Sequence, residues 1–196
     1  CSSECFGDTG SLPADESAPF QPKSPYATAK AAVFWMVKNY REAYNIPACS
    51  GILFNHESPL RPERFVTQKI ITAAIEISQG NNQELRLGNI DIVRDWGWAP
   101  EYVEAMHLIM QQEEADDFVV ATGDSHSLKD FLSYTFSYFD LDWEEYVSID
   151  ESLYRPSDIY VNRGNPEKVR SMLGWESSFT LKDIVHTMIE DKLNHD

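Results

Sequence analysis

A tyrosine and a lysine four residues apart are the side chains of this sequence best suited to do chemistry together. Tyr26 and Lys30 stand in residues 24–30, which read SPYATAK. On a helix this spacing places both side chains on one face. A neighbouring cation favours the phenolate and lowers the pKa of a tyrosine from about 10 toward neutrality, so that it can accept a hydroxyl proton while a cofactor accepts hydride from the same carbon. The alternative is a chance spacing, because the pattern Y-x-x-x-K alone has low specificity.

A hydroxyl and a carboxylate precede this pair in the chain. Residues 1–7 read CSSECFG, and we expect residues 1–5 to be the end of a strand that runs into a loop. Open α/β sheets carry their chemistry at the carboxyl ends of strands. The pattern therefore favours an active site that joins Ser2 and Glu4 to Tyr26 and Lys30. The alternative for Glu4 is an ordinary solvated loop carboxylate.

In this order the two groups resemble the extended short-chain dehydrogenase/reductase superfamily, in which a Ser or Thr near a strand end precedes Y-x-x-x-K on the next helix. Glu4 narrows the resemblance, because 4,6-dehydratases carry an acidic residue here and nucleotide-sugar 4-epimerases do not. Further segments resemble the GDP-mannose 4,6-dehydratase family over essentially the whole chain. They are GILFNHESP at 51–59, FVTQKI at 65–70, LGN at 87–89, RDWG at 94–97, YVEAM at 102–106, VATG at 120–123, YRP at 154–156 and LGW at 173–175.

The resemblance implies an α/β fold with part of a Rossmann-like, doubly wound parallel sheet and a smaller C-terminal lobe for the sugar nucleotide. We expect residues 1–55 to form the C-terminal part of the NAD(P)-binding domain and residues 56–196 mainly the substrate-binding lobe, with 117–121 returning to the sheet. No Gly-rich dinucleotide loop occurs in the sequence, which begins at Cys1. We therefore expect a C-terminal fragment of a longer enzyme, inactive alone and unstable without its N-terminal half, because its sheet would expose an unpaired edge.

Four residues carry the chemistry that the resemblance implies. Tyr26 matches the base that takes the O4 proton while hydride leaves C4, and Ser2 matches the hydroxyl that holds O4. Lys30 matches the residue that lowers the tyrosine pKa and hydrogen-bonds the nicotinamide ribose. Glu4 matches the base that removes the C5 proton, after which water is eliminated across C5 and C6 and the hydride returns to C6. GDP-mannose would become GDP-4-keto-6-deoxymannose.

Further residues match binding positions of the family. The cofactor-binding set is Tyr26, Lys30, His56 and Arg61, and the set for the GDP-sugar is Asn55, Lys69, Arg94 and Arg155. We expect NADP as the cofactor, with NAD as the alternative, because the residues that read the ribose 2′ position lie in the missing half. Three alternatives stay open: His56 as a structural histidine, Arg94 as the partner of Asp95, and Arg155 as a loop residue without a ligand.

Composition excludes several classes of partner. The chain has 196 residues, with 32 acidic and 16 basic side chains and a formal net charge of −16, which weighs against nucleic acid. No apolar run reaches the length of about 18 residues that a membrane span needs, so we expect no membrane partner. Three cysteines without C-x-x-C spacing argue against zinc and against a disulfide framework. We expect no metal, reduced thiols and a cytoplasmic protein.

Helical periodicity alternates with short apolar runs, which is typical of an α/β protein. We predict helices over 25–44, 63–79, 100–112, 127–139, 165–173 and 181–193. We predict strands at 1–5, 48–54, 85–87 and 117–121, and a loop over 8–23. Ser24 is the expected N-cap of the first helix and Ser127 that of the fourth.

Three hypotheses about function remain. The first is a GDP-sugar 4,6-dehydratase, acting on mannose or on a manno-heptose. The second is another epimerase or reductase of the superfamily, which Glu4→Gln would discriminate. The third is a non-catalytic fragment that binds sugar nucleotides. By analogy with the superfamily we expect a homodimer or homotetramer.

Overall fold

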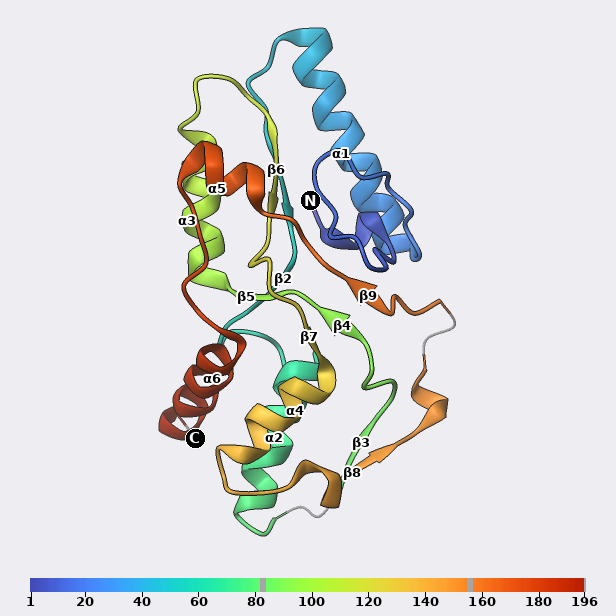
Figure 1. Cartoon of the computed structure of the whole chain (residues 1–196), viewed down its shortest axis with the longest axis vertical. Helices are drawn as coiled ribbons and strands as arrows, with labels where there is room; N and C mark the ends of the chain where they lie inside the picture. Colours follow the sequence, from blue (N-terminus) through green and yellow to red (C-terminus); the bar gives the residue numbers. More distant parts are fainter. Residues whose placement is uncertain (82–83, 155–156, 196) are drawn as a thin grey trace.

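A parallel pair of strands forms the centre of the upper half of the molecule (Figure 1). The computed structural model describes residues 1–81, 84–154 and 157–195. Strand β1 (Ser50–Leu53) pairs in parallel with β6 (Asp117–Val120), with Leu53 opposite Val120. Ser2 also bridges Leu53 in parallel. Because a strand residue has one partner on each edge, the first residues of the chain lie beside β1 on the edge that β6 does not occupy.

Helices cover both faces of this pair. Helix α1 (Pro25–Tyr44) lies on one side, and α3 (Ala99–Met110) and α5 (Glu167–Leu173) lie on the other (Figure 1). Side chains alternate between the faces, as strand geometry requires. The buried cluster toward α1 contains Phe34, Ile52, Phe54 and Val119, whereas the cluster toward α3 and α5 contains Tyr102, Ile109, Phe118, Val120 and Val169.

A second hydrophobic core is formed by side chains of the elements that Figure 1 draws in the lower half of the molecule. Helices α2 (Val66–Ser78), α4 (Leu128–Ser137) and α6 (Leu181–His195) pack together beside the parallel pair β3 (Leu85–Leu87) and β8 (Val147–Ile149). The members of this core include Ile70, Ile71, Phe131, Leu132, Ile184 and Met188.

Short strands lie between the two cores. Strand β2 (Asn55–Glu57) pairs in parallel with β5 (Trp96–Trp98). Strand β4 (Val93–Arg94) lies between β7 (His126–Ser127) and β9 (Val161–Asn162). The 3-10 helices are η1 (Ser3–Phe6), η2 (Trp143–Glu145) and η3 (Glu151–Leu153).

The predicted α/β class is confirmed, and all six predicted helices are present with ends shifted by a few residues. The largest shift is in α2, which begins at Val66 rather than Glu63 because the preceding residues form a turn closed by Phe65 N and the Pro62 carbonyl. The prediction of a strand over residues 1–5 is wrong after Ser2. The Ser2 hydroxyl accepts the Glu4 amide and starts η1, which ends at Gly7 with φ of 70°. The proposed division at residue 55 stays a prediction.

The buried carboxyl group of Asp95 connects the end of β6 to the β4–β5 segment. It accepts hydrogen bonds of 2.9 Å each from the Thr122 amide, the Thr122 hydroxyl and the Gly123 amide. Asp95 is fully buried, and burial raises its pKa to about 7 despite these donors. In the following strand β5, Gly97 packs so closely on the Tyr102 ring that a Cβ there would lie 2.2 Å from it, which leaves no room for a side chain.

Ser24→Ala should lower the free energy of unfolding by about 1 kcal/mol, because it removes an N-cap. The Ser24 hydroxyl accepts the Ala27 amide at 3.1 Å at the start of the helix that carries Tyr26. Chemical denaturation of the polypeptide that contains this chain measures the change. Ser24→Asp should restore stability, and Ser171→Ala, at an exposed position of α5, is the matched control. Equal stability of Ser24→Ala and the wild type would contradict the assigned cap.

Asp95→Asn should change how stability depends on pH. The folded state holds the Asp95 proton more tightly than the unfolded state, so this group's contribution is full below pH about 4 and is lost as pH rises through about 7. Denaturation curves should show a slope that differs between wild type and variant by up to about 1.4 kcal/mol per pH unit in this window. Asp91→Asn, at an exposed carboxylate, is the control. Parallel curves for wild type and Asp95→Asn would contradict the assignment.

Candidate active site

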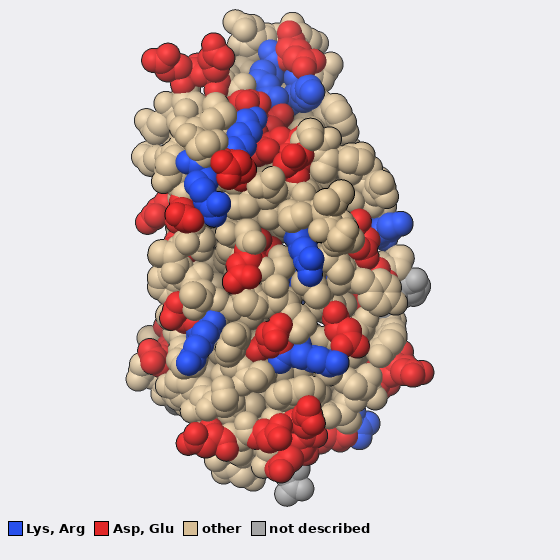
Figure 2. All heavy atoms as spheres, viewed as in Figure 1, with Lys and Arg blue, Asp and Glu red and all other residues tan. Residues whose placement is uncertain are grey.

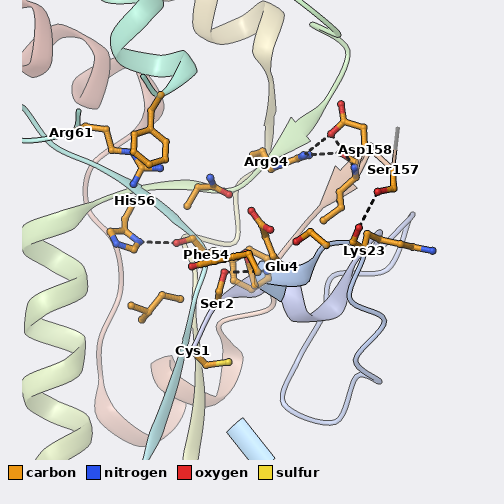
Figure 3. A pocket seen from close by; sticks show the side chains of 17 residues that line it. Cys1, Ser2, Glu4, Lys23, Phe54, His56, Arg61, Arg94, Ser157 and Asp158 are labelled. Atoms are coloured by element: carbon orange, nitrogen blue, oxygen red, sulfur yellow. Dashed lines mark hydrogen bonds and ion pairs between the residues drawn. The ribbon is translucent and has the colours of Figure 1, made fainter. Parts of the chain in front are cut away.

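A cavity of about 580 Å³ lies where β1 and the first residues of the chain end. Seven of the residues predicted from the sequence line it: Ser2, Glu4, Tyr26, Asn55, His56, Arg61 and Arg94. They come from the N-terminal segment, α1, β2 and its following turn, and β4, so the fold gathers segments that are far apart in the sequence. Figure 3 shows His56 and Arg61 at one end of the cavity, Ser2 and Glu4 at its centre, and Arg94 with Asp158 at the other end.

Hydrogen bonds to its backbone hold the segment that carries Ser2 and Glu4 in place. The Ser2 hydroxyl lies 3.4 Å from the Glu4 amide, which it accepts. The buried Asn162 side chain donates to the carbonyls of Ser3 and Gly7 at 3.2 and 3.1 Å. These bonds hold η1 against β9, and the Glu4 carboxylate points into the cavity (Figure 3). A proton acceptor needs a fixed backbone and a carboxylate that is not already hydrogen-bonded, and no described residue hydrogen-bonds the Glu4 carboxylate.

Tyr26 and Lys30 lie on one side of α1, as their spacing predicts. The Lys30 ammonium is 5.6 Å from the centroid of the Tyr26 ring. Tyr26 is on the cavity wall near the start of the helix and is about half exposed, whereas Lys30 lies one turn further along and does not line the cavity. Tyr26 therefore borders the cavity, and the Lys30 cation lies near its ring.

His56 presents a neutral ring to the cavity. Its Nδ1 lies 2.8 Å from the Phe54 carbonyl, which can only accept, so Nδ1 carries the proton and Nε2 is the acceptor. Burial lowers the His56 pKa and the nearby charge of Arg61 adds to this, although the hydrogen bond to the Phe54 carbonyl opposes the shift. No described residue hydrogen-bonds Nε2. The Nδ1 atom therefore has the structural contact that the sequence left as an alternative, and a ligand at Nε2 stays a prediction.

Arg94 is committed largely to the protein itself. Its guanidinium donates to the carbonyls of Val93 and Ile159 at 2.8 and 2.7 Å and lies 3.9 Å from Asp158. Asp95 receives its hydrogen bonds from Thr122 and Gly123, so the geometry does not favour the alternative Arg94–Asp95 pair. Arg94 fixes the segment that closes the far end of the cavity.

Lys69, like Lys30, does not line the cavity. The Lys69 ammonium donates to the Arg86 carbonyl at 2.7 Å, which ties α2 to β3 outside the cavity wall. Arg155 lies outside the described residues.

The sequence did not lead us to predict buried Glu57 or the cavity residues Lys23 and Phe65 as site residues. Burial raises the Glu57 pKa to about 7, although the charge of Arg61 and the Thr67 hydroxyl oppose the shift. The sequence signal for Glu57 was a carboxylate placed between the His56 and Arg61 positions, at the end of an apolar run.

The electrostatic surroundings of the cavity differ from those of the whole molecule. Figure 2 shows acidic side chains spread over the visible face, with Lys and Arg scattered among them and no continuous basic patch. The cavity wall instead gathers Lys23, Arg61 and Arg94 with the acidic Glu4 and Asp158. An anionic ligand would therefore depend on these local cations rather than on the net charge of the chain.

Several other kinds of site find no support in the described part of the chain. It contains no group of three or more His, Cys, Asp or Glu side chains able to hold a metal ion. Cys1, Cys5 and Cys49 are free thiols. Among the described helices, none combines the length and apolarity needed to cross a bilayer.

Comparison with solved structures agrees with the α/β assignment. The fold matches RMD from Pseudomonas aeruginosa complexed with NADPH, with a TM-score of 0.90, 20% identity and coverage of 100% of this chain and 65% of that chain. It also matches a dTDP-glucose 4,6-dehydratase from Bacillus anthracis in complex with NAD, with a TM-score of 0.88, 17% identity and coverage of 99% and 60%. At these identities the likeness shows the fold alone.

Sequence comparison identifies the family. The chain is 48% identical over 192 residues to GDP-mannose 4,6 dehydratase 1 of Arabidopsis thaliana, covering 98% of this chain and 53% of that protein. It is 43% identical to the Dictyostelium discoideum GDP-mannose 4,6 dehydratase, covering 98% and 59%. The chain thus spans little more than half the length of these relatives. Residues 1–188 match the family profile described as GDP-mannose 4,6 dehydratase, and the chain belongs to that family.

Proposed function

We propose that the polypeptide containing this chain dehydrates GDP-mannose to GDP-4-keto-6-deoxymannose with NADP as its cofactor. The observation that carries the proposal is the meeting of Ser2, Glu4 and Tyr26 at one cavity, with Lys30 near the Tyr26 ring. A phenol and a carboxylate on the same cavity supply two separate proton acceptors. Dehydration needs both, because one proton leaves O4 and another leaves C5.

Each residue has a defined task in this proposal. Ser2 holds the substrate O4 hydroxyl, and Tyr26 accepts its proton. Glu4 removes the C5 proton, which the C4 ketone makes acidic, and a water molecule is then eliminated with the C6 hydroxyl. Lys30 keeps a positive charge beside Tyr26 and binds the nicotinamide ribose. NADP, when bound, would supply the acceptor for the C4 hydride and the donor of the hydride that C6 receives. Of the protons taken by Tyr26 and Glu4, one leaves with the C6 hydroxyl as water and the other returns to C5 when C6 receives the hydride.

The cavity fits a nucleotide cofactor at the end where His56 and Arg61 lie. The Arg61 guanidinium lines the wall. Its buried Nε atom lies 3.3 Å from the Glu57 carboxylate without forming a hydrogen bond, and no described residue hydrogen-bonds its two Nη atoms. The neutral His56 Nε2 is an acceptor, which suits a ribose hydroxyl. These residues would hold the cofactor, while Asn55 and Arg94 border the space for the GDP-sugar, with Lys69 and Arg155 further candidates by resemblance alone.

Two alternatives, another enzyme of the superfamily and a non-catalytic binding protein, are less favoured. A 4-epimerase or a reductase needs no base at C5, so Glu4 would have no task in either. A non-catalytic sugar-nucleotide-binding protein would need neither Glu4 nor the Tyr26–Lys30 pair. We further propose a cytoplasmic homodimer or homotetramer, which is supported by the free thiols and by the exposed apolar side chains Trp35, Met36 and Tyr40 on α1.

Turnover of GDP-mannose tests the proposal directly. The polypeptide that contains this chain, incubated with GDP-mannose and NADP, should give a product lighter by one water in mass spectrometry. Binding of GDP-mannose without a product would overturn the dehydratase assignment in favour of another sugar or a binding role. Absence of any binding would overturn the guanine-nucleotide assignment as well.

Glu4→Gln should lower kcat by about 100- to 10,000-fold, because it removes a general base and keeps its size. Oxidation at C4 does not need Glu4, so bound reduced nicotinamide should accumulate and be visible by its absorbance. Glu42→Gln at an exposed position of α1 is the matched control and should leave kcat unchanged. Full turnover by Glu4→Gln would exclude Glu4 as the C5 base.

Tyr26→Phe should give an equally large loss of kcat but without reduced nicotinamide, because O4 deprotonation accompanies hydride removal. Tyr44→Phe, at the exposed end of the same helix, is its control. Reduced nicotinamide in the Tyr26→Phe variant at the wild-type rate would contradict the role of Tyr26.

A further inference from the structure

A buried carboxylate stands directly behind the cofactor end of the cavity. Glu57 is the last residue of β2, and only 1% of its surface is exposed. Its Oε2 atom accepts the Thr67 hydroxyl at 2.8 Å and lies 3.3 Å from Arg61 Nε. Burial of a carboxylate is costly unless it is paired, so these two contacts account for its presence in the interior.

Arg61 is held from two sides by this arrangement. The residues after β2 turn back on themselves, with the Arg61 amide donating to the Ser58 carbonyl at 3.0 Å, and this turn returns Arg61 to Glu57. The guanidinium carbon is 3.8 Å from the centroid of the Phe65 ring. The ring covers one face of the guanidinium, and the Glu57 charge attracts the Nε edge.

The rest of the Arg61 fork is left for a ligand. No described residue hydrogen-bonds its two Nη atoms, and both Arg61 and Phe65 line the cavity. An arginine fork binds phosphate oxygens through two parallel hydrogen bonds, but only in a limited range of orientations. Whatever fixes the Nε edge therefore also sets the direction in which the Nη edge points.

We infer that Glu57 is a positioning residue, which together with Thr67 orients Arg61 to bind a phosphate group of the dinucleotide cofactor. Thr67 fixes the carboxylate oxygen, that oxygen fixes the Nε edge, and the Nη edge then faces the cavity. Glu57 is buried beneath Arg61 and does not line the cavity. The inference rests on the proposed function for the identity of the ligand.

The test is a double-mutant cycle on NADPH binding in the polypeptide that contains this chain, monitored by nicotinamide fluorescence at about pH 8.5, above the Glu57 pKa of about 7. Glu57→Gln keeps the size of the side chain and an acceptor for Thr67 but removes the charge that holds Arg61. It should raise the Kd for NADPH by about tenfold in the wild-type background. In an Arg61→Ala background the same change should have no more than about a twofold effect. Additive effects of the two substitutions would overturn the inference.

Control variants separate positioning from general damage. Glu63→Gln removes a largely exposed carboxylate that pairs with Lys192 and should leave the NADPH affinity unchanged. In Glu57→Gln the Kd for GDP should also stay at its wild-type value, because Arg61 is assigned to the cofactor. Equal losses of NADPH and GDP affinity would point to a structural role and overturn the inference.

A second variant covers the case in which Glu57→Gln does not fold. Thr67→Val leaves Glu57 and Arg61 in place and removes only the hydrogen bond that fixes the carboxylate, and it should raise the Kd for NADPH about threefold. An unchanged Kd would overturn the inference. Non-additive effects of Glu57→Gln and Arg61→Ala on the Kd for NADPH, in a protein that does not turn over GDP-mannose, would support the positioning role and contradict the proposed function. Failure of the inference can therefore be told apart from failure of the proposed function.

Discussion

Three hydrogen bonds to the buried carboxyl group of Asp95 connect the two cores of this protein at the point where the cavity forms. The donors are the backbone and hydroxyl of Thr122 and the backbone of Gly123, directly after β6, while Asp95 itself separates β4 from β5. Since β5 pairs with β2, the position of this carboxyl group also sets the position of Asn55 and His56. The residue before it, Arg94, closes the opposite end of the cavity. A single buried side chain thereby constrains both ends of the site.

The parallel sheet explains why the chemistry gathers where it does. Ser2 and Val120 pair with Leu53 from opposite edges, so three segments end at the same border. Helices on both faces leave that border as the place where polar side chains can meet a ligand. Buried acidic groups then organise the cations of an otherwise strongly acidic chain. Glu57 holds Arg61, and the partly buried Asp158 accompanies Arg94.

Sequence patterns were sufficient for the helices and for most of the candidate site. Caps and apolar periodicity locate α1 and α4 almost to the residue, because Ser24 and Ser127 accept amides as N-caps do. The two-residue strands β4 and β7 were not predicted, because two residues are too few to show alternation. Lys69 shows the limit of motif transfer, since a side chain in a matching motif can point to the Arg86 carbonyl instead of the cavity. Burial of Glu57 and Asp95 depends on contacts between distant segments, which local sequence does not contain.

A crystal structure of the polypeptide that contains this chain, with NADPH and GDP bound, would test the assignment of the cavity most directly. We predict the nicotinamide ribose beside Tyr26 and Lys30, a cofactor phosphate on the Arg61 fork, and the GDP diphosphate on the side of Arg94. The carboxylate of Glu4 should then face the space left for the sugar. A cofactor or a GDP molecule bound away from this cavity, or a Glu4 carboxylate turned away from the sugar position, would contradict the assignment.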